Sequence, residues 1–130
     1  MGKIGGFKEF NRADEGNIAV VERVANYNEF TIALPKDKIK EQGSRCMDCG
    51  IPFCHSSCPL GNLIPDFNDM VHQEEWQSAL EILQSTNNFP EFTGRLCPAP
   101  CEKSCVLGII KEPVAIENNE KNIIERGFAE

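Results

Sequence analysis

Seven cysteines, all between residues 46 and 105, constrain this chain more than any other feature of its sequence. They make up about 5% of the 130 residues, which is high for an ordinary protein but below the level of a disulfide scaffold. An odd number of cysteines cannot all pair within one chain, and a reducing compartment would not keep such bridges. Metal or cluster binding is therefore the leading explanation, ahead of unconnected buried thiols.

The cysteines fall into two groups with short internal spacings. The groups are Cys46-x2-Cys49-x4-Cys54-x3-Cys58-Pro59 and Cys97-Pro98-x2-Cys101-x3-Cys105. Such spacings let several thiolates from one loop reach a single inorganic body, and a proline directly after the last cysteine of a run is typical of bacterial ferredoxin loops. The gap of four residues between Cys49 and Cys54 differs from the ferredoxin pattern, so the match is partial.

Zinc is the main alternative to iron–sulfur ligation. Cys46-x2-Cys49 is a normal half of a zinc site, and His55 or His72 could complete a site with three cysteines. However, a zinc ribbon separates its two CxxC pairs by roughly 15 residues, whereas here four cysteines lie within residues 46–58. A thioredoxin-type dithiol needs a βα unit, which the sequence does not predict. The spacing favours iron–sulfur clusters.

The ligand count raises a second question. Two four-iron clusters, each with four ligands, need one ligand more than the seven cysteines supply. Either one iron takes a non-cysteine ligand, or one cluster is [3Fe–4S]. In two-cluster ferredoxins the fourth cysteine of a run serves the other cluster. That rule groups the cysteines as Cys46, Cys49, Cys54 and Cys105 on one side, and Cys58, Cys97 and Cys101 on the other.

The last helix that we expect offers a candidate for the missing ligand. At helical spacing its apolar stripe consists of Ile116, Ile123, Ile124 and Gly127. Glu120 falls in the middle of this stripe, whereas Glu117 lies nearer its edge. Burying an unpaired carboxylate is costly, so Glu120 is the predicted eighth ligand. Two alternatives stay open: Glu120 reaches solvent or pairs with Lys121 or Arg126, or His55 is the ligand instead.

The hydrophobic pattern predicts an all-α fold of short helices joined by cysteine-bearing loops around two [4Fe–4S] clusters. Helices are expected over residues 35–42, 62–72, 74–84 and 113–126, with a weaker one near residues 20–24. Residues 92–101 are expected to be loop because they contain Gly94, Pro98 and Pro100. No sheet is expected. Residues 1–45 are interpreted as an N-terminal arm with a supporting helix, and residues 46–130 as the two-cluster domain.

Charge and hydropathy exclude several functions. The formal net charge of −7 argues against non-specific binding to nucleic acid or to an anionic membrane. No apolar run approaches the roughly 20 residues of a membrane span. The first residues lack the apolar core of a signal peptide, so a cytoplasmic location is expected.

Three longer segments then indicate a family. They are RCMDCGIPFCHSSCPLGNLIPDFND, NNFPEFTGRLCPAPCEKSCVLGI and PVAIENNEKNIIERGFAE. Together they resemble the N-terminal iron–sulfur domain of the glutamate synthase small (β) subunit. The resemblance covers nearly the whole chain. The domain is similar to one in dihydropyrimidine dehydrogenase and to one in the flavin subunit of a bifurcating NADH-dependent ferredoxin:NADP oxidoreductase.

The resemblance implies an electron-transfer function. In that family, FAD in the small subunit oxidises NADPH, and two [4Fe–4S] clusters relay the electrons to a [3Fe–4S] cluster and FMN in the large (α) subunit. There glutamate is formed from 2-oxoglutarate and glutamine-derived ammonia. The resemblance implies the same grouping of the seven cysteines, with a Gln or Glu seven residues after a helix-starting proline as the eighth ligand. Counting from Pro113, that position is Glu120.

The implied partners are the large subunit and the downstream FAD- and NADPH-binding domains. The chain has no GxGxxG fingerprint and ends at Glu130, where such a domain would begin. We therefore expect an excised domain or a stand-alone module that is not catalytic by itself. The alternative function is a zinc-stapled interaction or subunit-docking module without redox activity.

Residues around the cysteines have expected supporting roles. Arg45 and Arg95 each stand within two positions of a ligand cysteine and either offset cluster charge or are solvated. The apolar residues expected to shield the clusters from water are Ile51, Pro52, Phe53, Leu60 and Leu96. The glycines expected to allow close backbone approach, or to serve as plain turns, are Gly50, Gly61, Gly94 and Gly108. Because the helices are short, cluster loss is expected largely to unfold residues 46–105.

Overall fold

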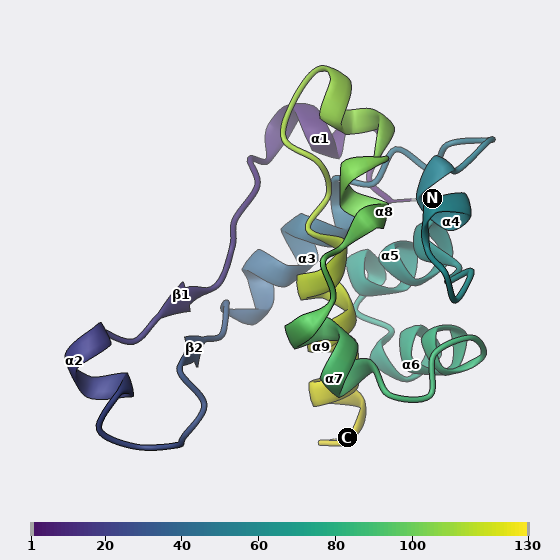
Figure 1. Cartoon of the computed structure of the whole chain (residues 1–130). Helices are drawn as coiled ribbons and strands as arrows, with labels where there is room; N and C mark the ends of the chain where they lie inside the picture. Colours follow the sequence, from purple (N-terminus) through teal and green to yellow (C-terminus); the bar gives the residue numbers. More distant parts are fainter. Residues whose placement is uncertain (1, 130) are drawn as a thin grey trace.

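Short helices dominate the computed structural model, which describes residues 2–129 (Figure 1). Along the chain the elements are α1 (Gly6–Glu9), β1 (Gly16–Asn17), α2 (Val20–Arg23), β2 (Thr31–Ile32), α3 (Lys36–Ser44), α4 (Phe53–Ser57), α5 (Ile64–Gln73), α6 (Trp76–Gln84), α7 (Pro90–Leu96), α8 (Pro100–Lys103), the 3-10 helix η1 (Val106–Ile109) and α9 (Ile116–Gly127). The four longest helices that the sequence predicts are confirmed as α3, α5, α6 and α9, and the fold is mainly α-helical as expected.

The core is formed where the apolar faces of α3, α5, α6 and α9 meet. Spacings of three and four residues place these side chains on one side of each helix. The fully or nearly fully buried members are Ile39 on α3, Ile64, Phe67 and Val71 on α5, Trp76, Ala79, Leu80 and Leu83 on α6, and Ile116, Ile123 and Ile124 on α9. The short helices thus build a larger core than the sequence suggests, and α5 and α6 contribute much of it. A cluster-dependent region is therefore expected in the cysteine loops rather than throughout residues 46–105.

Two predictions about secondary structure are wrong. Residues 92–101 are not a loop, because α7 runs from Pro90 to Leu96 and α8 begins at Pro100. Both prolines occupy the first turn of a helix, where the missing N–H has no intrahelical partner to lose. The expectation of no sheet is also wrong, since β1 and β2 pair antiparallel, with Gly16 opposite Ile32 and Asn17 opposite Thr31.

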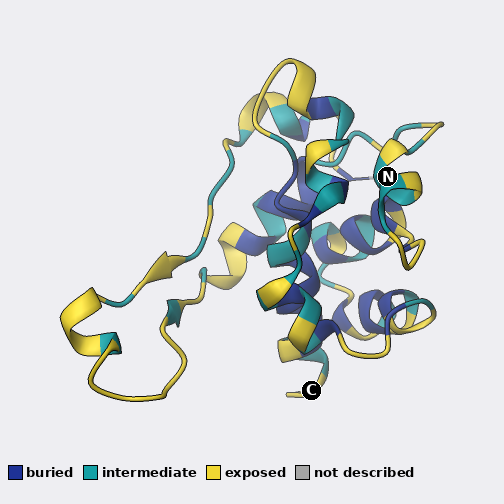
Figure 2. Ribbon diagram, viewed as in Figure 1, coloured by how far each residue is buried: buried dark blue, intermediate teal, exposed yellow. Residues whose placement is uncertain are grey.

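Residues 13–34 form an arm that extends away from the helical body (Figure 1). It contains the strand pair and α2, which confirms the short helix expected near residue 20. No side chain of α2 is buried, however, and Val20, Val21, Val24 and Tyr27 are exposed (Figure 2). The apolar residues of α2 therefore have helical spacing but do not pack into the core.

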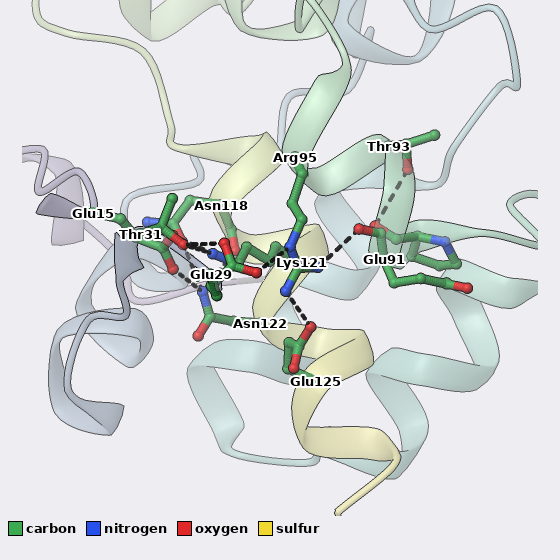
Figure 3. A network of polar contacts seen from close by, with 11 residues as sticks. Glu15, Glu29, Thr31, Glu91, Thr93, Arg95, Asn118, Lys121, Asn122 and Glu125 are labelled. Carbon is green, nitrogen blue, oxygen red and sulfur yellow. Dashed lines mark hydrogen bonds and ion pairs between the residues drawn. The ribbon is translucent and has the colours of Figure 1, made fainter. Parts of the chain in front are cut away.

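Polar contacts hold the base of the arm to α7 and α9 (Figure 3). Lys121 Nζ lies 2.5 Å from Glu15 Oε2 and donates to Thr31 Oγ1 at 2.7 Å. Arg95 bridges Glu29 of the arm and Glu125 of α9, at 2.9 and 2.7 Å. Lys121 is 6% exposed, so its ion pair is largely shielded from water.

Helices α7 and α9 approach closely at Gly94. A Cβ atom at this position would lie 2.8 Å from Lys121 Cα and 2.9 Å from Lys121 N, which the backbone of α9 cannot accommodate without moving. This close approach positions the end of α7, where Cys97 follows, beside the helix that carries Glu120. The expected close backbone approach is thus found at Gly94, between two helices. Among the described residues, no helix is long and apolar enough to cross a bilayer.

Candidate metal centre

Four cysteines from distant parts of the chain line one cavity. Cys46 and Cys49 follow α3, Cys54 lies in α4, and Cys105 directly precedes η1. The rest of the wall is mostly apolar and includes Met47, Pro52, Phe53, Ile64, Pro65, Val106, Leu107, Val114 and Ile116. The structure thus brings together the four cysteines that the crossover rule assigns to one cluster.

The environment of these thiols is electrostatically unfavourable for free thiolates. Burial raises the pKa of Cys46 to about 12 and that of Cys54 to about 11, and neighbouring cysteines add to both shifts. Burial also raises the pKa of Cys49, with Cys105 adding to it. Four adjacent thiolates in an apolar cavity require a positive partner, which is what a metal-containing cluster supplies. The donor set therefore fits a cluster.

The backbone of both cysteine loops adopts an uncommon conformation. Asp48, between Cys46 and Cys49, has φ 50°, and Ala99, between Cys97 and Cys101, has φ 46°. A left-handed conformation is uncommon for any residue with a side chain, and in alanine it has no local hydrogen bond to support it. Such strain often accompanies functional sites. No residue type in the sequence signals it, since glycine would be the usual choice at either position.

The second predicted set consists of Cys58, Cys97, Cys101 and Glu120. Cys101 is buried in α8, and its pKa is raised by burial and then by the charges of Glu120, Glu102 and Cys58. Cys101, Cys58 and Glu120 are therefore electrostatic neighbours. Cys97 follows α7 directly and lines a surface depression together with Ala99 and Glu102.

Glu120 is buried, as its place in the apolar stripe of α9 predicts. It is 6% exposed, and burial raises its pKa to about 7. Its Oε1 atom accepts a hydrogen bond from Asn62 Nδ2 at 3.0 Å, and Asn62 Oδ1 accepts one from Thr86 Oγ1 at 2.8 Å. This Thr86–Asn62–Glu120 chain of hydrogen bonds could not be predicted from the sequence, because its members lie in three separate segments.

The alternatives named for Glu120, namely Lys121 or Arg126 as its ion-pair partner and His55 as the ligand in its place, have other contacts. Lys121 contacts Glu15, and the Arg126 guanidinium lies 4.8 Å from the centre of the Trp76 ring. His55 Nε2 accepts a hydrogen bond from the backbone N–H of Ile64 at 2.9 Å, so its lone pair is engaged. Among the described residues Glu120 forms no ion pair, and this leaves its carboxylate available as a ligand.

The arrangement does not resemble a compact site for a single ion. Within residues 2–129, no three His, Cys, Asp or Glu side chains stand close enough together to hold one metal ion. A zinc site needs its four ligands within about 2.3 Å of a common point. Thiolates around a cubane cluster are spread over a larger body than the ligands of a single zinc ion.

The predicted shielding by apolar residues is partly wrong. Pro52 and Phe53 line the four-cysteine cavity. Ile51 and Leu96 are instead 75% and 79% exposed, and Leu60 is exposed as well. These three side chains lie in loops or at a helix end, where the hydrophobic pattern carries no information about direction.

The two arginines beside ligand cysteines differ sharply. Arg95 forms ion pairs with Glu29 and Glu125 at the surface. Arg45 is 1% exposed, and its guanidinium donates to the backbone carbonyls of Pro113 at 2.9 Å and Glu112 at 2.6 Å. Burial lowers the pKa of Arg45, and the charge of Arg12 adds to the effect. In the sequence both arginines stand close to a predicted ligand cysteine. Only the fold shows that Arg95 is paired at the surface and Arg45 is buried.

Comparison with known proteins gives a consistent result. The sequence profile of the family described as dihydropyrimidine dehydrogenase domain II, 4Fe-4S cluster, matches residues 23–130. The chain is 54% identical over 108 residues to the glutamate synthase [NADPH] small chain of Mycobacterium tuberculosis, which covers 83% of this chain and 22% of that protein. It is 47% identical to the corresponding small chain of Bacillus subtilis, over 98% of this chain and 28% of the relative.

A third relative is longer. The glutamate synthase [NADH] of Saccharomyces cerevisiae is 49% identical over 130 residues, which are 98% of this chain but 6% of the yeast protein. The chain therefore spans about a quarter of the length of the two bacterial relatives and a small part of the yeast one. The similarity includes the arm and both cysteine groups in the Bacillus and yeast proteins.

Proposed function

Because the chain belongs to the iron–sulfur family described as dihydropyrimidine dehydrogenase domain II, we propose that it is the electron-transfer domain of a glutamate synthase. The observation that carries the proposal is the common cavity of Cys46, Cys49, Cys54 and Cys105, formed by residues from both cysteine groups. Two [4Fe–4S] clusters would be its cofactors.

The first cluster would be held by the four cysteines of this cavity. Its apolar wall, which includes Ile64 and Leu107, excludes water and lowers the local dielectric. Solvent exposure and hydrogen bonds to sulfur set the potential of an iron–sulfur cluster, so these side chains tune it as well as shield it.

The second cluster would be held by Cys58, Cys97, Cys101 and Glu120. The electrostatic proximity of Cys58 and Glu120 to Cys101 supports this set. A carboxylate is a harder ligand than a thiolate, so the second cluster is expected to differ in potential from the first.

When bound, the two clusters supply one-electron transfer. The protein forms no bond in the substrate and instead holds both clusters in fixed positions. Helices α5 and α9 supply the rigid support, since Ile64 at the start of α5 and Glu120 on α9 each reach one of the two ligand sets. By the names of its relatives, the electrons would come from NADPH or NADH and be used for glutamate synthesis. The partners would be FAD- and NADPH-binding domains and the large subunit.

The test is the redox behaviour of the anaerobically purified chain. We expect a broad visible absorption that dithionite bleaches and that an oxidised electron acceptor restores. A colourless protein that contains zinc, and that iron and sulfide do not convert to a coloured form, would refute the electron-transfer function and favour an interaction module.

A further inference from the structure

Arg45 is a buried cation without an anionic partner. At 1% exposure it is the most deeply buried cation of residues 2–129. Its two hydrogen bonds go to the carbonyls of Pro113 and Glu112, which satisfy donors but carry no net charge. Its Nε atom has no hydrogen-bond partner in the described part of the chain. Burying a charge in this way is costly unless something nearby compensates it.

The charged residues around Arg45 do not compensate it. Arg12, which acts on Arg45 as a like charge, is itself paired with Glu102 and Asp14, each at 2.7 Å. The side chain of Glu112 is exposed and therefore screened by water. By contrast, Lys121, the other buried cation named above, has a direct carboxylate partner in Glu15. Of these two buried cations, Arg45 is the one without a carboxylate in direct contact among the described residues.

The position of Arg45 beside the four-cysteine cavity suggests what compensates it. Arg45 directly precedes Cys46, and the carbonyl of Pro113 that it binds directly precedes Val114; Cys46 and Val114 both line the cavity. Cys105, another cavity cysteine, is among the groups whose negative charge acts on Arg45. Arg45 is therefore joined to the wall of the proposed first cluster site through its neighbour Cys46 and through the segment that leads to Val114, while Pro113 and Glu112 themselves line the depression beside Cys97.

We infer that Arg45 is the buried counter-charge of the cluster held by Cys46, Cys49, Cys54 and Cys105, and that it raises the reduction potential of that cluster. The inference rests on the proposed function. A [4Fe–4S] cluster with four thiolate ligands carries about two negative charges when oxidised and about three when reduced. An adjacent cation in a low-dielectric environment stabilises the reduced form more. One electron enters, no bond changes, and the guanidinium stays protonated throughout.

A purely structural function for Arg45 makes a different prediction. Its two hydrogen bonds tie the first cysteine loop to the segment before α9, and this tether alone would explain its burial. In that case removal of the charge would affect assembly or stability but leave the potential of an assembled cluster unchanged.

The test is an EPR-monitored redox titration of the anaerobically purified chain and of the Arg45→Gln variant. We expect one of the two reduction waves to move to lower potential, with the one-electron equilibrium constant for reduction at least about tenfold smaller, which corresponds to about 59 mV. The wave that keeps its [4Fe–4S] EPR signal in Glu120→Ala protein identifies the four-cysteine cluster. Arg95→Gln is the matched control, because Arg95 also lies near a ligand cysteine but is paired at the surface, and both waves should remain in place.

Arg45→Lys keeps the experiment decisive if Arg45→Gln does not assemble clusters. If Arg45→Lys assembles them with a potential close to the wild-type value, the charge is what matters, and the inference holds. If Arg45→Gln assembles both clusters at unchanged potentials, or if Arg45→Lys fails in the same way as Arg45→Gln, the inference is wrong and Arg45 is a structural tether. Absence of clusters from the wild-type chain would instead refute the proposed function.

Discussion

The two proposed ligand sets of the domain are built differently. The set of Cys46, Cys49, Cys54 and Cys105 lies in an apolar cavity whose wall is made of loops, the short elements α4 and η1, and the first turns of α5 and α9. In the other set Glu120 comes from a long helix, and Asn62 and Thr86 support it through hydrogen bonds. Thiolates on loops and very short helices can adapt to the cluster, whereas a carboxylate on a long packed helix must be placed in advance. The second set is therefore expected to be more sensitive to changes in helix packing.

Of the changes considered, replacement of Glu120 by alanine should produce the largest difference between the two clusters. We expect Glu120→Ala to lose the second cluster, or to retain it only as [3Fe–4S], and to keep the first cluster, since none of the first cluster's ligands changes. Iron per chain should fall to about half in the first case. Glu117→Ala is the control on the same helix and should keep the wild-type iron content. Equal loss of both clusters in Glu120→Ala would contradict the independence of the two sets.

The buried carboxyl group of Glu120 should also make the metal-free protein sensitive to pH. Its pKa is raised from 4.5 to about 7, so its contribution to stability is fully present below pH 4.5 and is lost as the pH rises towards about 7. The free energy of unfolding should decrease by up to about 3 kcal/mol across this window, at 1.36 kcal/mol per pKa unit. Urea unfolding at pH 5 and pH 7.5 measures the change. In Glu120→Gln the free energy of unfolding should depend less on pH. An equally steep pH dependence in that variant would show that groups other than Glu120 cause it.

Replacement of Gly94 tests whether helix packing controls the second set. In Gly94→Ala the new Cβ would be 2.8 Å from Lys121 Cα, so α7 and α9 must separate. Overpacking of this kind costs about 1–3 kcal/mol. We expect a lower unfolding midpoint and weaker retention of the second cluster, with the first cluster unaffected. Gly16→Ala is a suitable comparison, because a Cβ there meets only side-chain atoms of Ile32 at 3.7 Å or more and φ is unstrained.

The smallest expected effect concerns Thr86. Thr86→Val removes the hydroxyl that binds Asn62 Oδ1 and keeps the shape of the side chain. Loss of one such hydrogen bond costs about 1 kcal/mol. We expect a shift in the EPR signal or potential of the second cluster, while the first stays constant. Ser85→Ala removes a neighbouring hydroxyl that donates to the carbonyl of Ile82, and it should change neither cluster.

Much of this organisation could be predicted from the sequence. The cysteine spacing and the crossover rule grouped Cys46, Cys49 and Cys54 with Cys105, and the structure brings these four together. The apolar stripe of α9 predicted the burial of Glu120. Both inferences use strong local regularities, namely short loop spacings and the helical repeat.

The remaining features depend on contacts between distant segments. A proline can either begin a helix or end one. Pro90 and Pro100 begin α7 and α8, and which of the two occurs depends on how the residues after each proline pack. Arg95 is paired with Glu29 of the arm and Glu125 of α9, whereas Arg45 is buried against the carbonyls of Glu112 and Pro113. This difference depends on tertiary contacts that the sequence does not show. The support of Glu120 by Asn62 likewise joins residues 58 positions apart.

The most direct test of the two-cluster account is the amount of iron and acid-labile sulfide in the anaerobically purified chain. The account predicts about eight of each per chain, with one cluster on four cysteines and the other on three cysteines and Glu120. About seven irons per chain would contradict Glu120 as a ligand by indicating a three-cysteine [3Fe–4S] site. About four of each would show that only one ligand set holds a cluster and would contradict the account as a whole.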